Sequence, residues 1–142
     1  RRKAITDLVR ETKNLIETVR PGVELSAAVK PNLYQARERY FQEWDVWLAA
    51  GYLDKAVVMN YTKNLKEFAD NIDIMYDNLP SKYRKKIVMG IATYNQPADQ
   101  VVDKVKYTRV TRFKGISFFS YNVMAQNPRY FRLIKKILYP RG

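Results

Sequence analysis

Four short apolar segments, each followed by a segment of helical periodicity, recur along this chain and limit the folds open to it. They cover residues 23–29, 54–61, 86–94 and 115–120. Their starts lie about 30 residues apart, which is the length of one βα unit. Strands that are apolar throughout are typical of a parallel sheet covered by helices on its faces. The repeat therefore predicts an α/β protein in which four parallel strands alternate with helices.

Apolar residues at helical spacing fill the segments between these strands. A first amphipathic helix precedes residue 20, and a second helix is predicted to run through residues 40–48. This second helix carries Tyr40, Phe41, Trp44 and Trp47 on one face. We interpret that aromatic face as core that packs on the sheet rather than as a platform for a sugar ring.

Two architectures are compatible with such a repeat. A doubly wound open sheet would carry a glycine-rich phosphate-binding turn, and no strand is followed by a G-x-G-x-x-G run. A (β/α)8 barrel averages about 250 residues, so this chain would make about half of one. We predict half of a (β/α)8 TIM barrel: residues 1–142 are expected to form a single domain, its C-terminal half. Its open sheet edges predict that it is a fragment of a larger protein or pairs with a second copy.

Neither cysteine nor histidine occurs in the sequence. Their absence excludes disulfides, thiolate metal ligands, a Ser-His-Asp triad and an ordinary catalytic zinc site within these residues. We expect no metal and no cofactor. Any chemistry would depend on carboxylate, tyrosine, lysine or asparagine side chains.

The net charge is +12, and most of the excess lies near the C-terminus. No acidic residue follows Asp103. The basic residues beyond it are Lys104, Lys106, Arg109, Arg112, Lys114, Arg129, Arg132, Lys135, Lys136 and Arg141. We interpret them as a solvated outer face whose balancing acids lie elsewhere in the protein. Binding of an anionic polymer is the alternative, and binding of nucleic acid a weaker one. No apolar run is long enough to suggest a membrane span.

Polar and aromatic side chains follow each predicted strand at its carboxyl end, where both architectures place their ligand sites. Asparagine, serine and tyrosine side chains supply hydrogen bonds for sugar hydroxyls, and aromatic rings supply flat apolar surfaces. The alternative is that they are ordinary loop and cap residues. The predicted substrate-binding residues are Lys30, Asn32, Asn60, Tyr61, Tyr94, Asn95, Ser120 and Tyr121.

Glycoside hydrolysis uses two carboxylates on either side of the scissile bond, and no strand end here carries one. Glu24 and Asp54 fall at strand starts, where a role in stability is expected. Asp99 lies in the first turn of a helix, where an acid complements the helix dipole. The catalytic residues are therefore unknown and are expected in the preceding half of the barrel.

Several short motifs are shared with a known family. They are Arg1-Arg2 before the first helix, the strand Glu24 to Val29, the run Tyr40-Phe41-Gln42-Glu43-Trp44 with Trp47-Leu48 and Gly51-Tyr52-Leu53-Asp54, Gly90-Ile91, and the final strand Gly115 to Tyr121. Together they resemble the bacterial glycosyl hydrolase-like lipoproteins, a TIM-barrel family related to glycan-cleaving enzymes. The resemblance covers nearly the whole chain.

This resemblance implies that the complete protein is a glycoside hydrolase acting on a bacterial or other polysaccharide outside the cytoplasm. It implies that this half contributes substrate-binding residues. Where the family has a P-Q-x-Y run, the second strand ends in Met59-Asn60-Tyr61-Thr62, so only Tyr61 carries over as a site residue. The alternatives are a non-catalytic carbohydrate-binding module and, more weakly, a polyanion-binding domain that uses the basic C-terminal helices.

Overall fold

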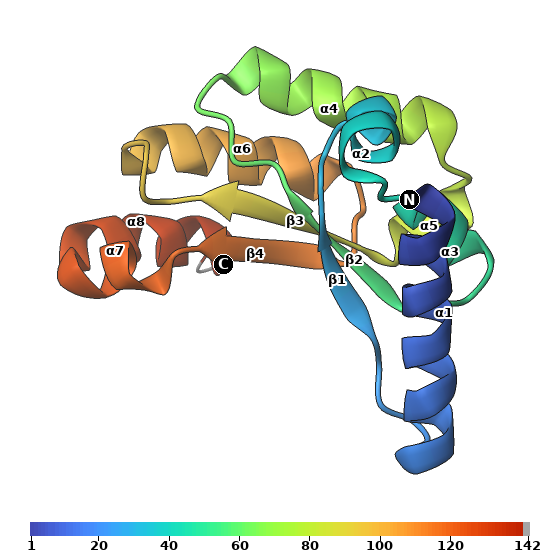
Figure 1. The fold of residues 1–142 in the computed structure, drawn as a ribbon. Coiled ribbons are helices and arrows are strands. Elements are labelled where there is room, and N and C mark those ends of the chain that lie inside the picture. Colours follow the sequence, from blue (N-terminus) through green and yellow to red (C-terminus); the bar gives the residue numbers. More distant parts are fainter. Residues whose placement is uncertain (141–142) are drawn as a thin grey trace.

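A single parallel sheet forms the centre of the protein, as the computed structural model, which describes residues 1–140, shows (Figure 1). The strand order β1-β2-β3-β4 equals the order along the chain. This arrangement confirms the predicted α/β class and the consecutive parallel strands of a half TIM barrel. The strands are slightly shorter than predicted: β1 (Ser26–Val29), β2 (Lys55–Met59), β3 (Ile87–Ala92) and β4 (Gly115–Phe119).

Helices occupy every connection between the strands and also both ends of the described chain. None of those in residues 1–140 is long and apolar enough to cross a membrane. The short helices α5 and α7 were not predicted. The helices are α1 (Arg2–Val19), α2 (Leu33–Tyr40), α3 (Trp44–Ala49), α4 (Leu65–Asn78), α5 (Ser81–Arg84), α6 (Ala98–Val110), α7 (Tyr121–Gln126) and α8 (Pro128–Leu138).

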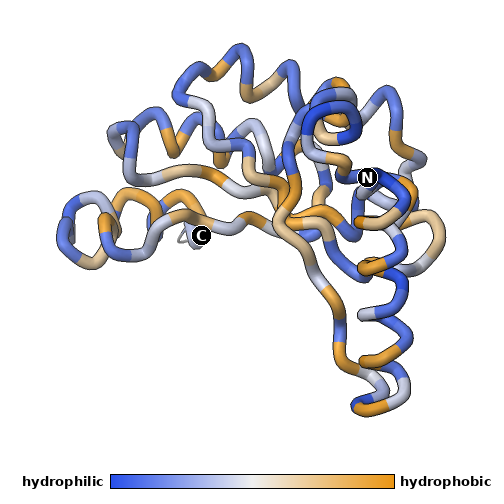
Figure 2. The backbone as a smooth tube through the Cα atoms, viewed as in Figure 1, coloured by the Kyte–Doolittle hydropathy of each residue, from blue (hydrophilic) through white to orange (hydrophobic). Residues whose placement is uncertain are grey.

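The two faces of the sheet are buried to different degrees. In β2, Ala56 and Val58 are fully buried against the helices, whereas Val57 and Met59 on the opposite face are only half-buried. Figure 2 shows the apolar strands running through the middle of the molecule. Side chains alternate between the faces of a strand, and neighbours in register share a face. The register therefore assigns one set of residues to the less buried side, called here the inner face: Ser26, Ala28, Lys55, Val57, Met59, Val88, Gly90, Ala92, Gly115, Ser117 and Phe119.

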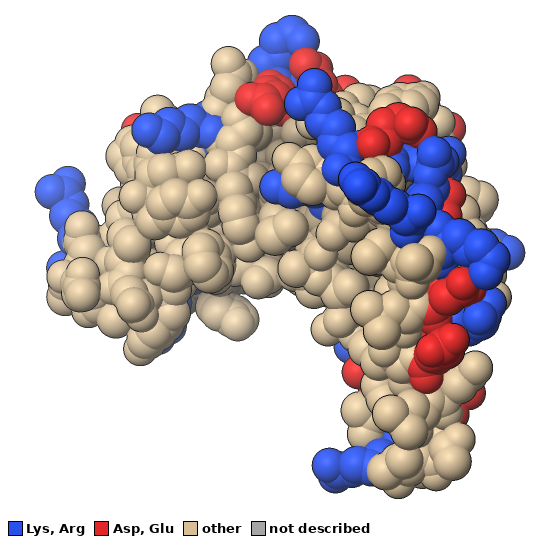
Figure 3. Space-filling model, viewed as in Figure 1, with Lys and Arg blue, Asp and Glu red and all other residues tan. Residues whose placement is uncertain are grey.

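A hollow lies below the sheet, between α1 and the C-terminal helices (Figure 3). In this view most of the surface around it is uncharged. Helix α1 has no buried residue, and Leu8 and Leu15 on it are 61% and 63% exposed. The inner face and the apolar side of α1 therefore lack the cover that the other face of the sheet receives from α4 and α6.

The predicted single helix through residues 40–48 is wrong, because the chain breaks at Phe41. This residue adopts a left-handed conformation with φ of 57°, which ends α2 and lets the Gln42 N–H donate to the Ala36 carbonyl. The chain then restarts as α3. Trp44 and Trp47 are buried, as predicted for core residues, whereas Tyr40 is exposed.

Asp54 joins three elements at the end of the sheet where the strands begin. Its carboxylate accepts hydrogen bonds from the Leu25 N–H at 2.7 Å and from Lys13 Nζ of α1 at 2.8 Å. Burial alone would raise the pKa of this carboxyl, but the bonds from Lys13 and Leu25 hold its pKa below the ordinary value. Asp54 therefore fixes α1 and the start of β1 relative to β2.

Candidate functional site

Three aromatic rings meet at the carboxyl ends of β2, β3 and β4. Tyr61 stacks on Phe119 with ring centroids 5.6 Å apart and an interplanar angle of 12°. Tyr94 stands nearly perpendicular to both, at 6.4 Å from Tyr61 and 6.0 Å from Phe119. Both separations are typical of favourable aromatic pairs. These three residues are called here the aromatic cluster.

A glycine in β3 allows this cluster to form on the inner face. A Cβ atom at Gly90 would lie 3.1 Å from Cε1 of Tyr61 and 2.5 Å from the Val58 carbonyl oxygen. The absence of a side chain therefore lets the Tyr61 ring lie against the strand. Burial there, and secondarily the nearby Tyr94, raises the pKa of the Tyr61 hydroxyl. Tyr94 and Phe119 are 53% and 54% exposed, so their rings are open to a ligand.

Hydrogen bonds fix the loops around the aromatic cluster. Asn95 Nδ2 donates to the Tyr61 carbonyl at 3.1 Å, and Thr93 Oγ1 donates to the Ser120 carbonyl at 2.8 Å. The Thr93 N–H also donates to the Phe119 carbonyl at 2.7 Å. The Asn95 Oδ1 atom is buried and has no partner within residues 1–140. The structure thus brings together four of the predicted residues: Tyr61, Tyr94, Asn95 and Ser120.

The other predicted residues have different surroundings. Lys30 lies with its Nζ atom 4.6 Å from the centre of the Tyr40 ring. Asn32 caps α2, because its side chain accepts from two backbone N–H groups of the first turn. Tyr121 begins α7 and is 67% exposed. None of the hydrogen bonds or aromatic contacts in residues 1–140 joins these side chains to the aromatic cluster.

Asn60 is fully buried, and its amide is used within the fold. Its Nδ2 donates to the Phe68 carbonyl at 3.0 Å, and its Oδ1 accepts from Asn71 Nδ2 at 3.0 Å. Both partners belong to α4. Asn60 therefore holds α4 against the end of β2 and positions the neighbouring Tyr61 indirectly.

A buried lysine, which the sequence analysis did not single out, joins two of the loops beneath the site. Lys104 of α6 is fully buried, and its Nζ donates to the carbonyls of Thr62 at 2.5 Å and Lys63 at 3.0 Å. It also donates to Oε1 of Gln96. Burial lowers the pKa of Lys104, and the charge of Glu67 opposes that shift. The sequence does contain a signal for this burial, because Lys104 lies at helical spacing among the apolar residues of the buried face of α6.

Tyr130 of α8 supports the site from below. Its hydroxyl donates to the carbonyls of Thr93 at 3.3 Å and Gln96 at 3.2 Å. Burial, and secondarily the charge of Asp99, raises the pKa of Tyr130 to about 12. In the unfolded chain this hydroxyl loses its proton near pH 10, so its contribution to stability is complete below pH 10 and is lost as the pH rises toward 12.

We therefore expect the stability advantage of the wild type over Tyr130→Phe to depend on pH. At pH 8 it should be about 1 kcal/mol, the net value of a buried hydrogen bond. At pH 11 it should be smaller by roughly 1 kcal/mol, because one pH unit beyond the unfolded pKa corresponds to about 1.4 kcal/mol. Urea unfolding of both proteins at the two pH values measures the difference, in which the other tyrosines cancel. A difference that stays constant between pH 8 and 11 would contradict this prediction.

Carboxylates are absent from the contacts of the aromatic cluster within residues 1–140. Glu67 of α4 accepts from Thr62 Oγ1 at 2.6 Å, in the loop that follows β2. In the same residues, no group of three or more acidic side chains is placed to hold a metal ion. The described residues therefore place aromatic rings and tyrosine hydroxyls at this point, but not the pair of carboxylates that glycoside hydrolysis commonly uses.

Comparison with known families agrees with this arrangement. A family model described as glycosyl hydrolase-like 10 matches residues 1–105, which extend from the first helix into α6. No curated protein matches the chain. Phe119, Ser120 and Tyr121 lie beyond the matched residues. The match confirms the resemblance seen in the sequence motifs and supports a glycoside hydrolase-related function. Because it covers well over half of the sequence, the chain belongs to the glycosyl hydrolase-like 10 family.

Proposed function

We propose that this chain supplies carbohydrate-binding residues to a glycoside hydrolase whose substrate is a polysaccharide. The observation that carries the proposal is the aromatic cluster at the carboxyl ends of three neighbouring strands. Its exposed members, Tyr94 and Phe119, present two rings at 86° to each other. Such a corner offers one ring face for a sugar ring and a second wall beside it.

Polar groups next to the rings match the hydroxyls of a sugar. The Tyr61 and Tyr94 hydroxyls can donate or accept hydrogen bonds. Ser120 and Tyr121 follow Phe119 directly in the chain. In this proposal Lys30 and Asn32, at the end of β1, contact a more distant unit of the same glycan.

The carboxylates for hydrolysis come, in this proposal, from further βα units that complete the barrel. Three observations support it: the aromatic cluster has no carboxylate, the inner face is open, and apolar residues of α1 are exposed. We accordingly regard residues 1–142 as one half of a larger barrel domain.

A second copy of this chain is a less suitable way to close the barrel and to supply the missing carboxylates. In a barrel, the helix that follows a strand packs beside the next strand. Closure by two copies would therefore bring α8 of one copy and α1 of the other to the same position outside the sheet. A second copy would also add only the same strand ends without carboxylates. A different set of βα units avoids both difficulties.

Removal of the exposed rings should weaken glycan binding. We expect Tyr94→Ala and Phe119→Ala each to reduce the affinity for a bound oligosaccharide by about 5- to 10-fold, because a favourable aromatic contact contributes about 1 kcal/mol. Calorimetric titration with neutral β-linked oligosaccharides and soluble cell-wall glycan fragments measures the effect. Tyr139→Ala, which removes an exposed tyrosine after α8, is the matched control and should bind like the wild type.

Two results would contradict the proposed site. One is equal affinity in all three variants, and the other is the absence of binding to every glycan by natively folded protein. A non-catalytic binding module is the second candidate, favoured by the lack of carboxylates at the cluster. Binding without hydrolysis of the same glycan by the complete barrel would support this module over the enzyme.

A further inference from the structure

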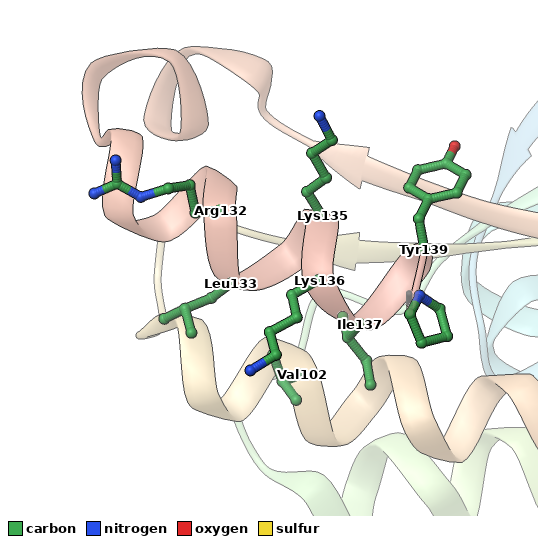
Figure 4. A pocket seen from close by; sticks show the side chains of 8 residues that line it. Val102, Arg132, Leu133, Lys135, Lys136, Ile137 and Tyr139 are labelled. Atoms are coloured by element: carbon green, nitrogen blue, oxygen red, sulfur yellow. The ribbon is translucent and has the colours of Figure 1, made fainter. Parts of the chain in front are cut away.

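Helix α6 has two sides with different surroundings. On its outer side, Val102 lines a groove of about 810 Å³ together with Leu133 and Ile137 of α8 (Figure 4). Lys104 follows two residues later, which is about 200° further around a helix, and it does not line this groove. Its side chain is instead fully buried beneath the loops that follow β2 and β3. Position 104 therefore belongs to the interior of the fold, under the candidate site.

The ammonium group of Lys104 joins these two loops with all of its donors. Two of its N–H groups donate to the carbonyls of Thr62 at 2.5 Å and Lys63 at 3.0 Å, in the loop after β2 and directly behind Tyr61. The third donates to Oε1 of Gln96, in the loop after β3. An ammonium group has three donors, so none remains for any other role.

Gln96 is itself held in place by the surrounding fold. Its Nε2 donates to the Ala92 carbonyl at the end of β3, and its backbone carbonyl accepts from the Tyr130 hydroxyl of α8 at 3.2 Å. The loop after β3 is therefore fixed to its strand and to α8. Through Gln96, Lys104 connects the loop after β2 to this fixed frame.

The charge of Lys104 is buried without an ion pair. None of the ion pairs within residues 1–140 involves it. The loop carbonyls and the Phe68 ring, whose centre lies 5.6 Å from Nζ, stabilise the cation instead. Burying a charge costs free energy that an apolar side chain of the same size would not. What the cation adds is a set of three directional hydrogen bonds that fix the distance between the loops.

These two loops carry rings that meet at the candidate site. Tyr61 from one loop and Tyr94 from the other lie with centroids 6.4 Å apart and planes at 87°. One other side chain connects the loops directly, because Asn95 Nδ2 donates to the Tyr61 carbonyl at 3.1 Å. A single hydrogen bond allows rotation about itself, whereas a second connection, through Lys104, fixes the orientation of one loop relative to the other.

We propose that Lys104 is a positioning residue for glycan binding, which sets the angle between the Tyr61 and Tyr94 rings without touching the ligand. Its effect on affinity rests on the proposed carbohydrate site. Its effect on the two rings does not, and the two effects can be measured separately.

A double-mutant cycle tests the effect on affinity. Lys104→Met should weaken oligosaccharide binding about 5-fold, because the Tyr94 ring is still present but no longer correctly placed. In a Tyr94→Ala background the same change should alter the affinity by less than about 2-fold, since the ring that Lys104 positions is already absent. Calorimetric titration measures all four proteins, after circular dichroism has confirmed that each is folded.

Leu53→Ala is the matched control for lost stability. Leu53 is fully buried just before β2, at the end of the sheet opposite the aromatic cluster, so its truncation leaves a cavity far from the rings. This variant should bind glycan like the wild type. If Lys104→Met does not fold, Lys104→Gln, whose amide keeps two donors, replaces it and should show a smaller loss in the same cycle.

Nuclear Overhauser contacts between the Tyr61 and Tyr94 rings test the positioning without any glycan. We expect them in the wild type and in Leu53→Ala, and we expect their loss in Lys104→Met. Unchanged ring contacts in Lys104→Met, an equal loss of affinity in Leu53→Ala, or additive effects of Lys104→Met and Tyr94→Ala would each overturn the inference. A wild-type protein that binds no glycan would contradict the proposed function, and the ring contacts would still decide the role of Lys104.

Discussion

Gly90→Val is expected to destabilise the protein by about 3 to 5 kcal/mol, because the new side chain has no space on the inner face. Its Cβ would lie 2.5 Å from the Val58 carbonyl oxygen, which belongs to the neighbouring strand, and 3.1 Å from the Tyr61 ring. Either the pairing of β2 with β3 or the position of Tyr61 must change. Urea unfolding measures the loss of stability, and the glycan affinity of the remaining folded protein reports on the ring.

The same substitution at Gly115 is the matched control. Gly115 also lies in a strand of the sheet, but a Cβ atom there would meet nothing within 4 Å. We expect Gly115→Val to change the free energy of unfolding by less than about 1 kcal/mol, since the residue gains β propensity without a clash. Losses at the two glycines that agree within about 1 kcal/mol would show that close packing at Gly90 is not the cause.

Lys104→Met is expected to lower the free energy of unfolding by about 3 kcal/mol, an effect of similar size to that of Gly90→Val. Methionine fills a similar volume but cannot donate a hydrogen bond to Thr62, Lys63 or Gln96. Gln96 is a buried acceptor, and such an acceptor costs about 1 to 3 kcal/mol when it loses its donor. The Thr62 and Lys63 carbonyls lie nearer to solvent and add less, and the gain from burying a neutral side chain offsets part of the sum. Thermal and urea unfolding measure the net change.

Lys106→Met, two residues further along α6, is the control for Lys104. Lys106 is exposed, and its only ion pair among the described residues is with Asp103 at 3.5 Å. Its loss should change stability by less than about 0.5 kcal/mol. Equal stability of Lys104→Met and Lys106→Met would contradict this prediction. It would mean that water can donate to the loop carbonyls in place of the Lys104 ammonium group.

The fold was predictable because its signals are local. Each strand and the helix after it lie within about 30 residues, so the apolar repeat directly shows the βα unit. The break between α2 and α3 could not be predicted from the sequence, because it depends on a tertiary contact. The left-handed Phe41 turns the chain so that Trp44 Nε1 can donate to the Lys30 carbonyl at 3.1 Å. The helical spacing of the aromatic residues continues across this turn, so the spacing alone gives no sign that the helix breaks there.

The location of the candidate site was easier to predict than its members. The strand ends indicated Tyr61, Tyr94 and Asn95, which the structure brings together. Phe119 was counted as part of a buried strand, since sequence alone does not show that β4 is an edge strand with an exposed last residue. Asn60 was expected to meet substrate, but a buried amide is satisfied by whichever backbone lies beside it, here that of α4.

The strand order has a consequence for how the chain folds during its synthesis. Each strand pairs in parallel with the strand that left the ribosome immediately before it, and none has to wait for a distant segment. Closing each connection involves only about 30 residues, so the entropy cost of each loop is similar and modest. Units can therefore be added one at a time to a growing edge, which β4 forms once these four strands have been made. Until the chain is complete, that advancing edge is the surface at which wrong pairing between nascent chains would begin.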